Sequence, residues 1–431
     1  MQILLINPPN CGRSIPEEQY GITSLKQIFR GEPLALESLA GNLNGHDVAI
    51  ADLKADPQCL QRALKDLRPD VVGFTAVTCE ANTVMRLARE VKETCGALTV
   101  VGGSHASNDP EFFNHRAMDF VVIGLGKKSF RDLVEALGSG NLQPQIPGIA
   151  KTTPHAPMSW TSRVFTQADL VEENPPRYDL VAPHRAHYTL KSLGLELGFV
   201  ASAHGCPFDC DFCCIAPITG GRYLTQSIDA VIRDIGLLGD IPVIRLVDAN
   251  TFGNPEHAAK LAQAIQDAGI RKHFLADVRS DTVVRHPNLL RKWKEIGLRA
   301  VIIGFEEISD QALATMNKSN CAGMNREAIA ILHEIGITIV GDYIVSPDYE
   351  ERNFDHLERY LSDNPVDLPI FTVLTPLPGT PLHARMKERI TIHDLDYYTL
   401  TNAVVPTRLR EKLFYERYAG LIQAGHANAR L

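Results

Sequence analysis

The sequence predicts an α/β protein built from a doubly wound parallel sheet and a second series of strands and helices. With 431 residues the chain is too long for one compact core and suits two domains with a small appendage. Short apolar runs alternate with stretches of helical periodicity, the pattern of sheets covered by helices. A proline-rich segment separates the two series and indicates a linker.

The first series predicts a parallel sheet with glycine-rich turns at the carboxyl ends of its strands. Because ligands bind over the carboxyl ends of such strands, the glycines there, Gly102 with Gly103 and Gly124 with Gly126, would let the backbone approach a bulky ligand closely. We expect strands at residues 2–7, 47–52, 70–75, 98–103 and 120–124, and helices at 33–43, 57–67, 82–95 and 129–137.

The second series begins after a segment, residues 138–183, that has many prolines and little apolar periodicity. This segment reads as a linker that wraps rather than folds. A helix predicted at the end of the chain could belong to a lid over the second unit or to a packing cap. We expect strands at residues 195–205, 243–247, 274–278, 300–305, 338–345 and 370–374, and helices at 227–238 and 411–423.

Composition narrows the class of protein. Net charge is −8, and Lys and Arg form no long run, so a nucleic-acid partner is not indicated. No stretch approaches the roughly 18 to 20 apolar residues of a membrane span, and the first apolar run is too short for a signal peptide. We therefore expect a cytoplasmic protein. Nine cysteines in a reducing compartment indicate metal or redox chemistry rather than disulfides.

Three cysteines, Cys206, Cys210 and Cys213, lie on one short loop at spacings of four and three residues. Thiolates spaced in this way can converge on one metal cluster, but three of them leave one position of a cubane unfilled. A zinc knuckle or buried structural cysteines are the alternatives, although closed zinc sites take four ligands. Cys214 is surplus by this count and reads as a small buried hydrophobe.

These cysteines, with Phe208 and Phe212 between them, resemble the CxxxCxxC loop of the radical S-adenosylmethionine (SAM) superfamily. The resemblance implies that they hold a 4Fe-4S cluster whose open iron binds SAM, and that reductive cleavage of SAM gives a 5′-deoxyadenosyl radical. It also implies a partial (β/α)6 TIM-like barrel with the cluster and SAM over the mouth at the strands' carboxyl ends.

The resemblance further assigns SAM contacts to polar residues that follow the later strands. The family usually has two adjacent aspartates after the second strand, and Ala249 replaces one of them here. Besides Phe212 beside the cluster, the candidates are Asp248 and Asn250 for the amino group, Arg279 and Asp281 for the carboxylate, Glu306 for the ribose, and Thr375 with Pro376 for the adenine.

The first unit resembles the Rossmann-like cobalamin-binding domain that precedes many radical SAM cores. The likeness rests on segments 72–75, 101–105 and 122–126. The family usually has acidic residues after both glycines of the last segment, where this chain has Leu125 and Lys127. A flavodoxin-like nucleotide-binding or scaffolding unit remains the alternative. Candidate contacts are Thr75, Thr78, Gly102, Gly103, His105, Gly124 and Gly126.

The resemblance implies that no protein histidine lies beneath cobalt. Classical cobalamin domains have an Asp-x-His-x-x-Gly loop after the first strand, and this chain has none. We expect cobalamin to bind base-off with water or nothing below, because a strong donor would oppose reduction of cobalt. A thiolate of Cys79 is a minor alternative. His105 is expected to hydrogen-bond to the corrin side chains.

Together these features predict a cobalamin-dependent radical SAM enzyme, most simply a methyltransferase acting on an unactivated carbon of a small molecule such as a lipid or tetrapyrrole. The alternatives are a cobalamin-bearing cyclase or rearrangement enzyme, or a non-catalytic sensor. An electron donor such as flavodoxin or ferredoxin is implied. The expected domains are 1–140 for cobalamin, 141–194 as linker, 195–384 as the radical SAM barrel and 385–431 as a C-terminal cap.

Overall fold

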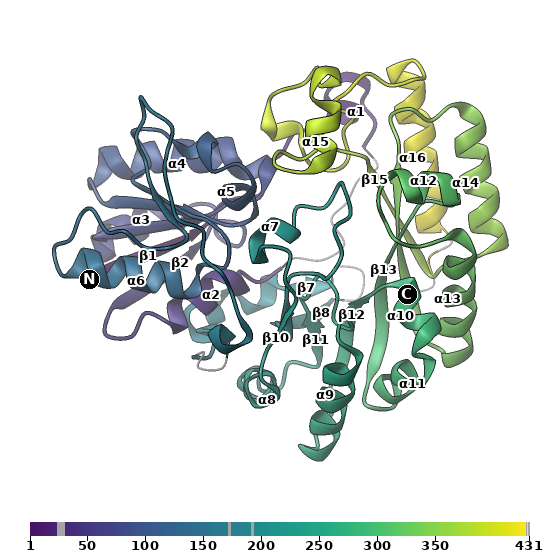
Figure 1. Ribbon diagram of the computed structural model, residues 1–431, viewed down its shortest axis with the longest axis horizontal. Coiled ribbons are helices and arrows are strands. Elements are labelled where there is room, and N and C mark those ends of the chain that lie inside the picture. The colour runs from purple at the N-terminus through teal and green to yellow at the C-terminus, as the bar shows by residue number, and fades with distance from the viewer. Residues whose placement is uncertain (24–30, 171–173, 191–193, 428, 430–431) are drawn as a thin grey trace.

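The computed structural model describes residues 1–23, 31–170, 174–190, 194–427 and 429. Two α/β units lie side by side, the first sheet in purple and blue and the second in teal and green (Figure 1). The C-terminal segment lies against the second unit. Among the described residues, no helix is both long enough and apolar enough to cross a membrane.

The first unit is a doubly wound sheet, as predicted. Apolar side chains alternate between its two faces, so Ile3 and Leu5 pack toward one layer of helices and Leu4 and Ile6 toward the other. Helices α2 (Leu34–Gly41) and α6 (Gly126–Gly138) cover the first face, and α3 (Cys59–Leu67) and α4 (Ala81–Thr94) cover the second. The strand order is β2 (Asp47–Asp52), β1 (Gln2–Asn7), β3 (Val71–Thr75), β4 (Leu98–Gly102), β5 (Phe120–Val122) and β6 (Ile149–Lys151).

The proline-rich segment folds in part, contrary to the prediction that it only wraps. Its strand β6 pairs antiparallel with β5 and forms the edge of the first sheet. Only three residues long, β6 gives too short an alternation to be recognised in the sequence. The short helices α1 (Ile15–Tyr20) and α5 (Ser104–Asn108) were also not predicted.

The second unit is an open half-barrel in which six parallel strands are neighbours in chain order, as predicted. A short strand, β7 (Thr189–Leu190), adds antiparallel to its first edge. The predicted domain boundaries remain predictions, and the one after residue 384 falls inside α15 (Pro381–Met386). The parallel strands are β8 (Leu195–Val200), β11 (Val243–Leu246), β12 (His273–Val278), β13 (Leu298–Glu306), β14 (Thr338–Val345) and β15 (Leu368–Val373).

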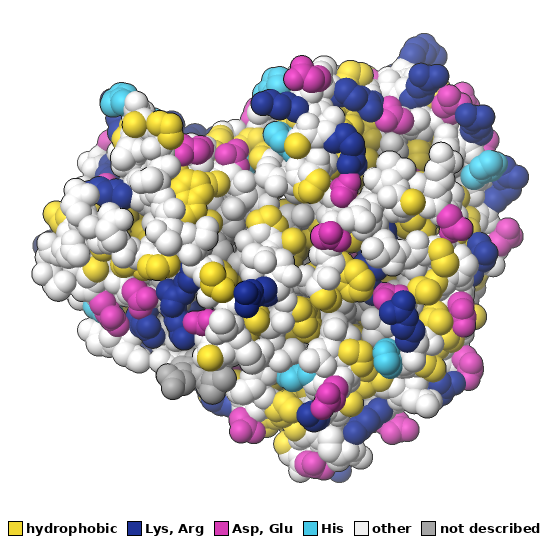
Figure 2. Space-filling model, in the orientation of Figure 1, with side chains coloured by type: hydrophobic (Ala, Val, Ile, Leu, Met, Phe, Trp, Pro, Cys, Tyr) yellow, Lys and Arg dark blue, Asp and Glu magenta, His cyan; other side chains and the backbone are white. Residues whose placement is uncertain are grey.

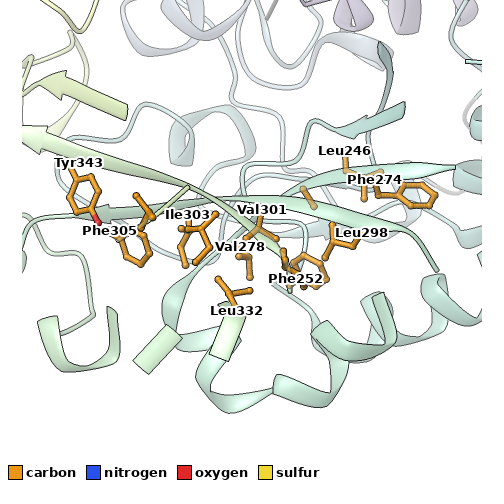
Figure 3. Packing of buried hydrophobic residues seen from close by; sticks show 14 of the residues in the cluster. Leu246, Phe252, Phe274, Val278, Leu298, Val301, Ile303, Phe305, Leu332 and Tyr343 are labelled. Atoms are coloured by element: carbon orange, nitrogen blue, oxygen red, sulfur yellow. The ribbon is translucent and has the colours of Figure 1, made fainter. Parts of the chain in front are cut away.

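Helices cover the outer face of the half-barrel and bury its core. Figure 3 shows strand side chains such as Val301 and Phe305 packed in this layer with Leu332 of α13 (Ala322–Ile335). The indole of Trp293 is fully buried and donates a hydrogen bond to the carbonyl of Ala258 at 3.0 Å. The remaining helices of this layer are α8 (Ile228–Leu237), α9 (Pro255–Asp267), α10 (Ser280–Arg285), α11 (Pro287–Glu295), α12 (Asp310–Thr315) and α14 (Glu351–Asp363).

The predicted C-terminal helix is present as α16 (Glu411–Ala427), which packs against β15. Ahead of it, the buried side chain of Asn402 joins distant parts of the chain. Its amide oxygen accepts from the backbone N–H of Ile15 at 2.8 Å, and its amide nitrogen donates to the carbonyls of Arg13 and Tyr397, each at 2.8 Å. The C-terminal segment is thereby fixed to the loop that follows β1.

On the face shown in Figure 2, basic and acidic side chains are interspersed.

A buried group of carboxyls lies where the first unit meets the start of the half-barrel. The Glu32 side chain is fully buried and pairs with Arg185 at 2.6 Å. The nearby Glu37 is also fully buried, and its carboxyl shares a hydrogen bond with that of Glu32. Burial, and then the charge of Glu32, raises the pKa of Glu37 well above its usual value. Glu37 therefore keeps its proton to a higher pH than it would in the unfolded chain.

We expect Glu37→Gln to stabilise the protein increasingly as pH rises. Because the folded pKa of Glu37 is raised, its contribution to stability is present at low pH and is lost as pH climbs from the ordinary glutamate value through the raised one. Glutamine has no proton to lose. Thermal unfolding at several pH values should show a gain over wild type that widens toward alkaline pH. Glu93→Gln, on the exposed side of α4, is the control, and an equal effect of both changes at all pH values would contradict the assignment.

Candidate active site

The cysteine loop lies at the mouth of the half-barrel, held by a hairpin. Strand β9 (Ala203–His204) pairs antiparallel with β10 (Leu224–Thr225), and the loop runs between them. Cys206, Cys210 and Cys213 are half-buried free thiols. Burial raises the pKa of Cys213 to about 12, so iron binding would release its proton.

The donor set is of the kind that holds an iron–sulfur cubane. In a cubane each thiolate binds a different iron, and three thiolates leave the fourth iron open. Cys206, Cys210 and Cys213 are free, soft thiol donors at spacings of four and three residues on one loop. Their role as cluster ligands stays a prediction.

The two residues between the second and third cysteines are held by α15. Asp211 accepts a hydrogen bond through its carbonyl from the N–H of Leu382 at 2.9 Å, and its carboxylate pairs with Arg385. The ring of Phe212 packs in an apolar cluster with Leu382 and Met386. Phe212 was predicted to contact a cofactor, and these contacts indicate that it also anchors the loop.

Asp248, predicted to meet the SAM amino group, fixes the chain just ahead of the cysteine loop. It follows β11, is 3% exposed, and accepts hydrogen bonds from Ser202 N at 2.7 Å, Ser202 Oγ at 2.6 Å and Ala203 N at 2.8 Å. These bonds occupy most of its acceptor capacity. A direct contact of Asp248 with SAM stays a prediction. Its bonds to Ser202 and Ala203 indicate that Asp248 positions the start of the cysteine loop.

Asn250, two residues further on, has the opposite character. Its side chain is 1% exposed, yet neither its amide oxygen nor its amide nitrogen has a partner. A buried amide without partners costs about 1–3 kcal/mol, so a polar ligand group at this strand end would be stabilising. Asn250 thus fits the predicted contact with the amino acid part of SAM.

We expect Asp248→Ala and Asn250→Ala to fail in different ways. The first removes the acceptor of the N–H groups of Ser202 and Ala203, so the cysteine loop should loosen and the cluster should be lost faster to a chelator. The second should retain the cluster and weaken SAM binding about tenfold, the value of one polar contact. The loss of cluster absorbance in the presence of a chelator measures the first effect. Titration of the cluster-loaded protein with SAM measures the second. Weaker SAM binding in Asp248→Ala with no faster loss of the cluster would contradict the positioning role.

A buried ion pair lies at the end of β13. Glu306 has a left-handed backbone with φ of 63°, and its carboxylate pairs with Lys318 at 2.6 Å. Both side chains lie over Gly304, where an added Cβ would meet the Glu306 carboxylate at 2.2 Å. Such strain in a non-glycine residue often marks a functional position. Sequence reasoning did not select Lys318, although a lysine within the polar stretch of residues 317–320 was a signal.

Arg279, predicted to bind the SAM carboxylate, is held among protein groups. Its guanidinium pairs with Asp281 at 3.0 Å, donates to the carbonyl of Lys318 at 2.7 Å, and lies 3.5 Å from the centre of the Phe208 ring. It therefore joins the cysteine loop to the segment that carries Lys318. The SAM contacts of Arg279 and Asp281 stay predictions.

The inner face of the half-barrel carries further charge. Arg245 on β11 pairs with Asp277 on β12. Burial, and then the charges of Glu306 and Asp277, raises the pKa of Asp342 on β14 to about 8, so this carboxyl keeps its proton near neutral pH. In the turn that follows β15, the hydroxyl of Thr375 donates a hydrogen bond to the carbonyl of Val373 at 2.9 Å. The contact of Thr375 and Pro376 with the adenine of SAM stays a prediction.

A cavity of about 390 Å³ lies between the first sheet and the half-barrel. Its floor is the carboxyl edge of the sheet and the facing sides of α2 and α6, and its far wall comes from the half-barrel next to the cysteine loop. The size is within the usual range for cofactor sites. The predicted contacts that line it are Thr75, Gly102, Gly103, Gly124 and Gly126, and the half-barrel residues include Ala201, Ala203, His204, Ile218 and Val247.

The other two predicted contacts, Thr78 and His105, do not line this cavity. The His105 ring is 1% exposed and packs edge-on against Phe112 and Phe113, with centroids 5.1 Å and 5.6 Å away. Burial lowers the pKa of His105 to about 4, so the ring is neutral. The expected hydrogen bonds from His105 to the corrin are therefore unsupported, because α5 turns its side chain toward these aromatic rings.

His204 was not selected from the sequence, although it stands two residues before the first cysteine of the loop. It lines the cavity from the half-barrel side. Its Nε2 lies 3.1 Å from the amide nitrogen of Gln226, and burial lowers the pKa of His204 to about 3. A neutral imidazole thus faces the space between the two units.

Comparison with known proteins agrees with this arrangement. Residues 28–134 match the B12 binding domain, and residues 200–361 match the Radical SAM superfamily. The chain is 29% identical over 398 residues to the hopanoid C-3 methylase of Methylococcus capsulatus, which covers 90% of this chain and 75% of that protein. It is 26% identical over 339 residues to the bacteriochlorophyllide d C-12(1)-methyltransferase of Chlorobaculum tepidum, covering 76% and 68%.

Among solved structures, the radical S-adenosylmethionine methyltransferase TsrM from Kitasatospora setae, with cobalamin and a [4Fe-4S] cluster bound, shares the fold. It matches with a TM-score of 0.73 and 16% identity over 100% of this chain and 92% of that chain. A thiolate loop at a half-barrel mouth, facing a cavity on a B12 binding domain, defines a radical SAM protein with a second cofactor. The chain therefore combines a B12 binding domain with a Radical SAM domain.

Proposed function

We propose that this enzyme transfers a methyl group to an unactivated carbon of a largely apolar, ring-rich small molecule. The observation that carries the proposal is the cavity that the B12 binding domain and the cysteine-loop side of the half-barrel line together. Two cofactors facing one space is what a reaction divided between them requires. The relatives named for hopanoid and bacteriochlorophyllide methylation support the class of substrate.

When bound, the cluster with SAM supplies a 5′-deoxyadenosyl radical and cobalamin supplies the methyl group. The balanced reaction consumes the substrate C–H, two SAM and two electrons, and gives the methylated carbon, S-adenosylhomocysteine, methionine and 5′-deoxyadenosine. A protein such as flavodoxin or ferredoxin would supply the electrons. Cys206, Cys210 and Cys213 would hold the cluster, and Asn250 and Glu306 would orient SAM.

The glycine-rich edge of the first sheet would hold cobalamin. A whole cobalamin is larger than the cavity, so the cavity would receive one end of it between the sheet, α2 and α6. Gly103 has φ of 100°, and an added Cβ would stand 2.8 Å from the Ala76 backbone, so only glycine fits this turn. Gly124, with φ of 86°, makes the neighbouring turn in the same way.

We expect no nitrogen ligand beneath cobalt. Burial raises the pKa of the Cys79 thiol to about 12, which makes it a poor donor, and His105 points into an aromatic cluster. Electron paramagnetic resonance of protein loaded with cob(II)alamin should therefore lack nitrogen superhyperfine splitting. Splitting in the wild type would overturn this part of the proposal. Its loss in His204→Ala would identify His204 as the ligand, and its persistence there would indicate another imidazole or the nucleotide base.

Isotope labelling tests the proposed function. Anaerobic incubation of the loaded enzyme with methyl-labelled SAM, a reductant and candidate hopanoid or tetrapyrrole substrates should give labelled product and 5′-deoxyadenosine. A changed product without label would indicate a cyclase or rearrangement enzyme. Absence of 5′-deoxyadenosine under reduction, with both cofactors bound, would indicate a sensor. Either result would overturn the methyltransferase proposal.

A further inference from the structure

A short helix of the B12 binding domain touches the cysteine loop of the half-barrel. Helix α5 (Ser104–Asn108) begins directly after Gly103 and ends at Asn108. The Asn108 side chain donates one hydrogen bond to the carbonyl of Ser104 at 2.7 Å and another to the carbonyl of Cys214 at 3.0 Å. Asn108 is thus bonded at once to the domain that lines the cavity and to the residue that follows Cys213.

Through Ser107, near its end, helix α5 is fixed to both glycine turns of the cavity. The hydroxyl of Ser107 donates to the carbonyl of Gly103 at 2.9 Å and accepts from the N–H of Gly124 at 3.0 Å. Both glycines line the cavity. A change in either turn on ligand binding would therefore move α5 as one piece, and Asn108 with it.

The far side of Asn108 is closed by the half-barrel. Gly379, in the turn before α15, has φ of 81°, and an added Cβ would stand 2.3 Å from the Asn108 carbonyl oxygen. The helix that follows the cysteine loop, α7 (Ala216–Thr219), also packs against α5. Because α15 in turn holds Asp211 and Phe212 of the loop, α5 has little room to move without moving the loop.

We propose that Asn108 is a positioning residue that couples occupancy of the cobalamin cavity to the stability of the cluster loop. The coupling rests on the proposed function, since it assumes that the cavity takes the corrinoid and the three cysteines take the cluster. It acts through the Gly103 and Gly124 turns, α5 and the bond to the Cys214 carbonyl. Linkage then requires that each cofactor tighten the other's binding by the same factor.

The test uses the full chain loaded with the cluster, with and without hydroxocobalamin. In the wild type, hydroxocobalamin should slow the bleaching of the cluster by an iron chelator about fivefold or more. Asn108→Ala and the nearly isosteric Asn108→Asp, which both lack the donor, should bleach at the same rate with and without it. Asn114→Ala is the matched control, since that asparagine lies in the same domain and its side chain bonds to Glu111, Thr153 and Ala156, away from the loop.

Titration with hydroxocobalamin completes the test. Wild type should bind it about fivefold more tightly with the cluster than without it, and both Asn108 variants should lose this difference while still binding. Protection of the Asn108 variants equal to wild type would overturn the proposal, because a merely shielding corrinoid needs no bond to Cys214. If wild type binds no hydroxocobalamin, the proposed function has failed instead.

Discussion

Cys206→Ala, Cys210→Ala and Cys213→Ala should each remove the brown colour of the cluster and all cleavage of SAM. A cubane held by two thiolates lacks a ligand on two of its irons and is not retained. The loop itself should persist, because α15, the Met316 carbonyl and the β9–β10 hairpin hold it without iron. Iron and sulfide analysis after anaerobic reconstitution, with circular dichroism to confirm folding, measures the effect.

Cys214→Ala is the matched control for these variants. The contact that the structure gives Cys214 uses its backbone carbonyl, which accepts from Asn108, and alanine keeps that carbonyl. We expect normal iron content and SAM cleavage. Loss of the cluster in Cys214→Ala together with its retention in Cys213→Ala would show that the ligand assignment is wrong.

Glu306→Gln should both destabilise the protein and weaken SAM binding, and the two effects can be separated. Removing one partner of a buried ion pair typically costs about 3–5 kcal/mol, and the side chains of Glu306 and Lys318 are only 10% and 8% exposed. The double variant Glu306→Gln with Lys318→Met should recover most of that stability, because no buried charge is left unpaired. Thermal unfolding of the single and double variants measures this part.

SAM affinity should not recover in the double variant. If Glu306 accepts a hydrogen bond from SAM, its loss weakens binding about ten- to hundredfold, the value of a charged hydrogen bond. Titration of cluster-loaded protein with SAM gives this number. Wild-type affinity in the stable double variant would remove Glu306 from the SAM site and leave the ion pair with a structural role alone.

Much of the fold could be predicted because apolar strands and amphipathic helices alternate along most of the chain. The parallel strands of both units lie where periodicity places them, and the six strands of the half-barrel follow chain order. In the first unit the misses are short. Strand β6 and helices α1 and α5 span three to six residues, too few for a period to show, and β6 owes its place to pairing with β5.

The site was predicted as a set of residue types, but not as a network of bonds. Sequence spacing identifies the cysteines, and strand ends identify Asp248 and Glu306. Spacing cannot tell that Asp248 is occupied by the backbone ahead of the cysteine loop, or that Lys318 reaches Glu306 from twelve residues away. Nor can it tell that the His105 ring points away from the cavity, because the direction depends on how α5 packs against Phe113.

The most direct test of the account is cofactor analysis of protein purified without oxygen and reconstituted. A cobalamin-dependent radical SAM enzyme should carry about four iron, about four sulfide and about one corrinoid per chain, and should release 5′-deoxyadenosine from SAM only when reduced. Zinc in place of iron, or iron and sulfide with no corrinoid bound even at excess hydroxocobalamin, would contradict it.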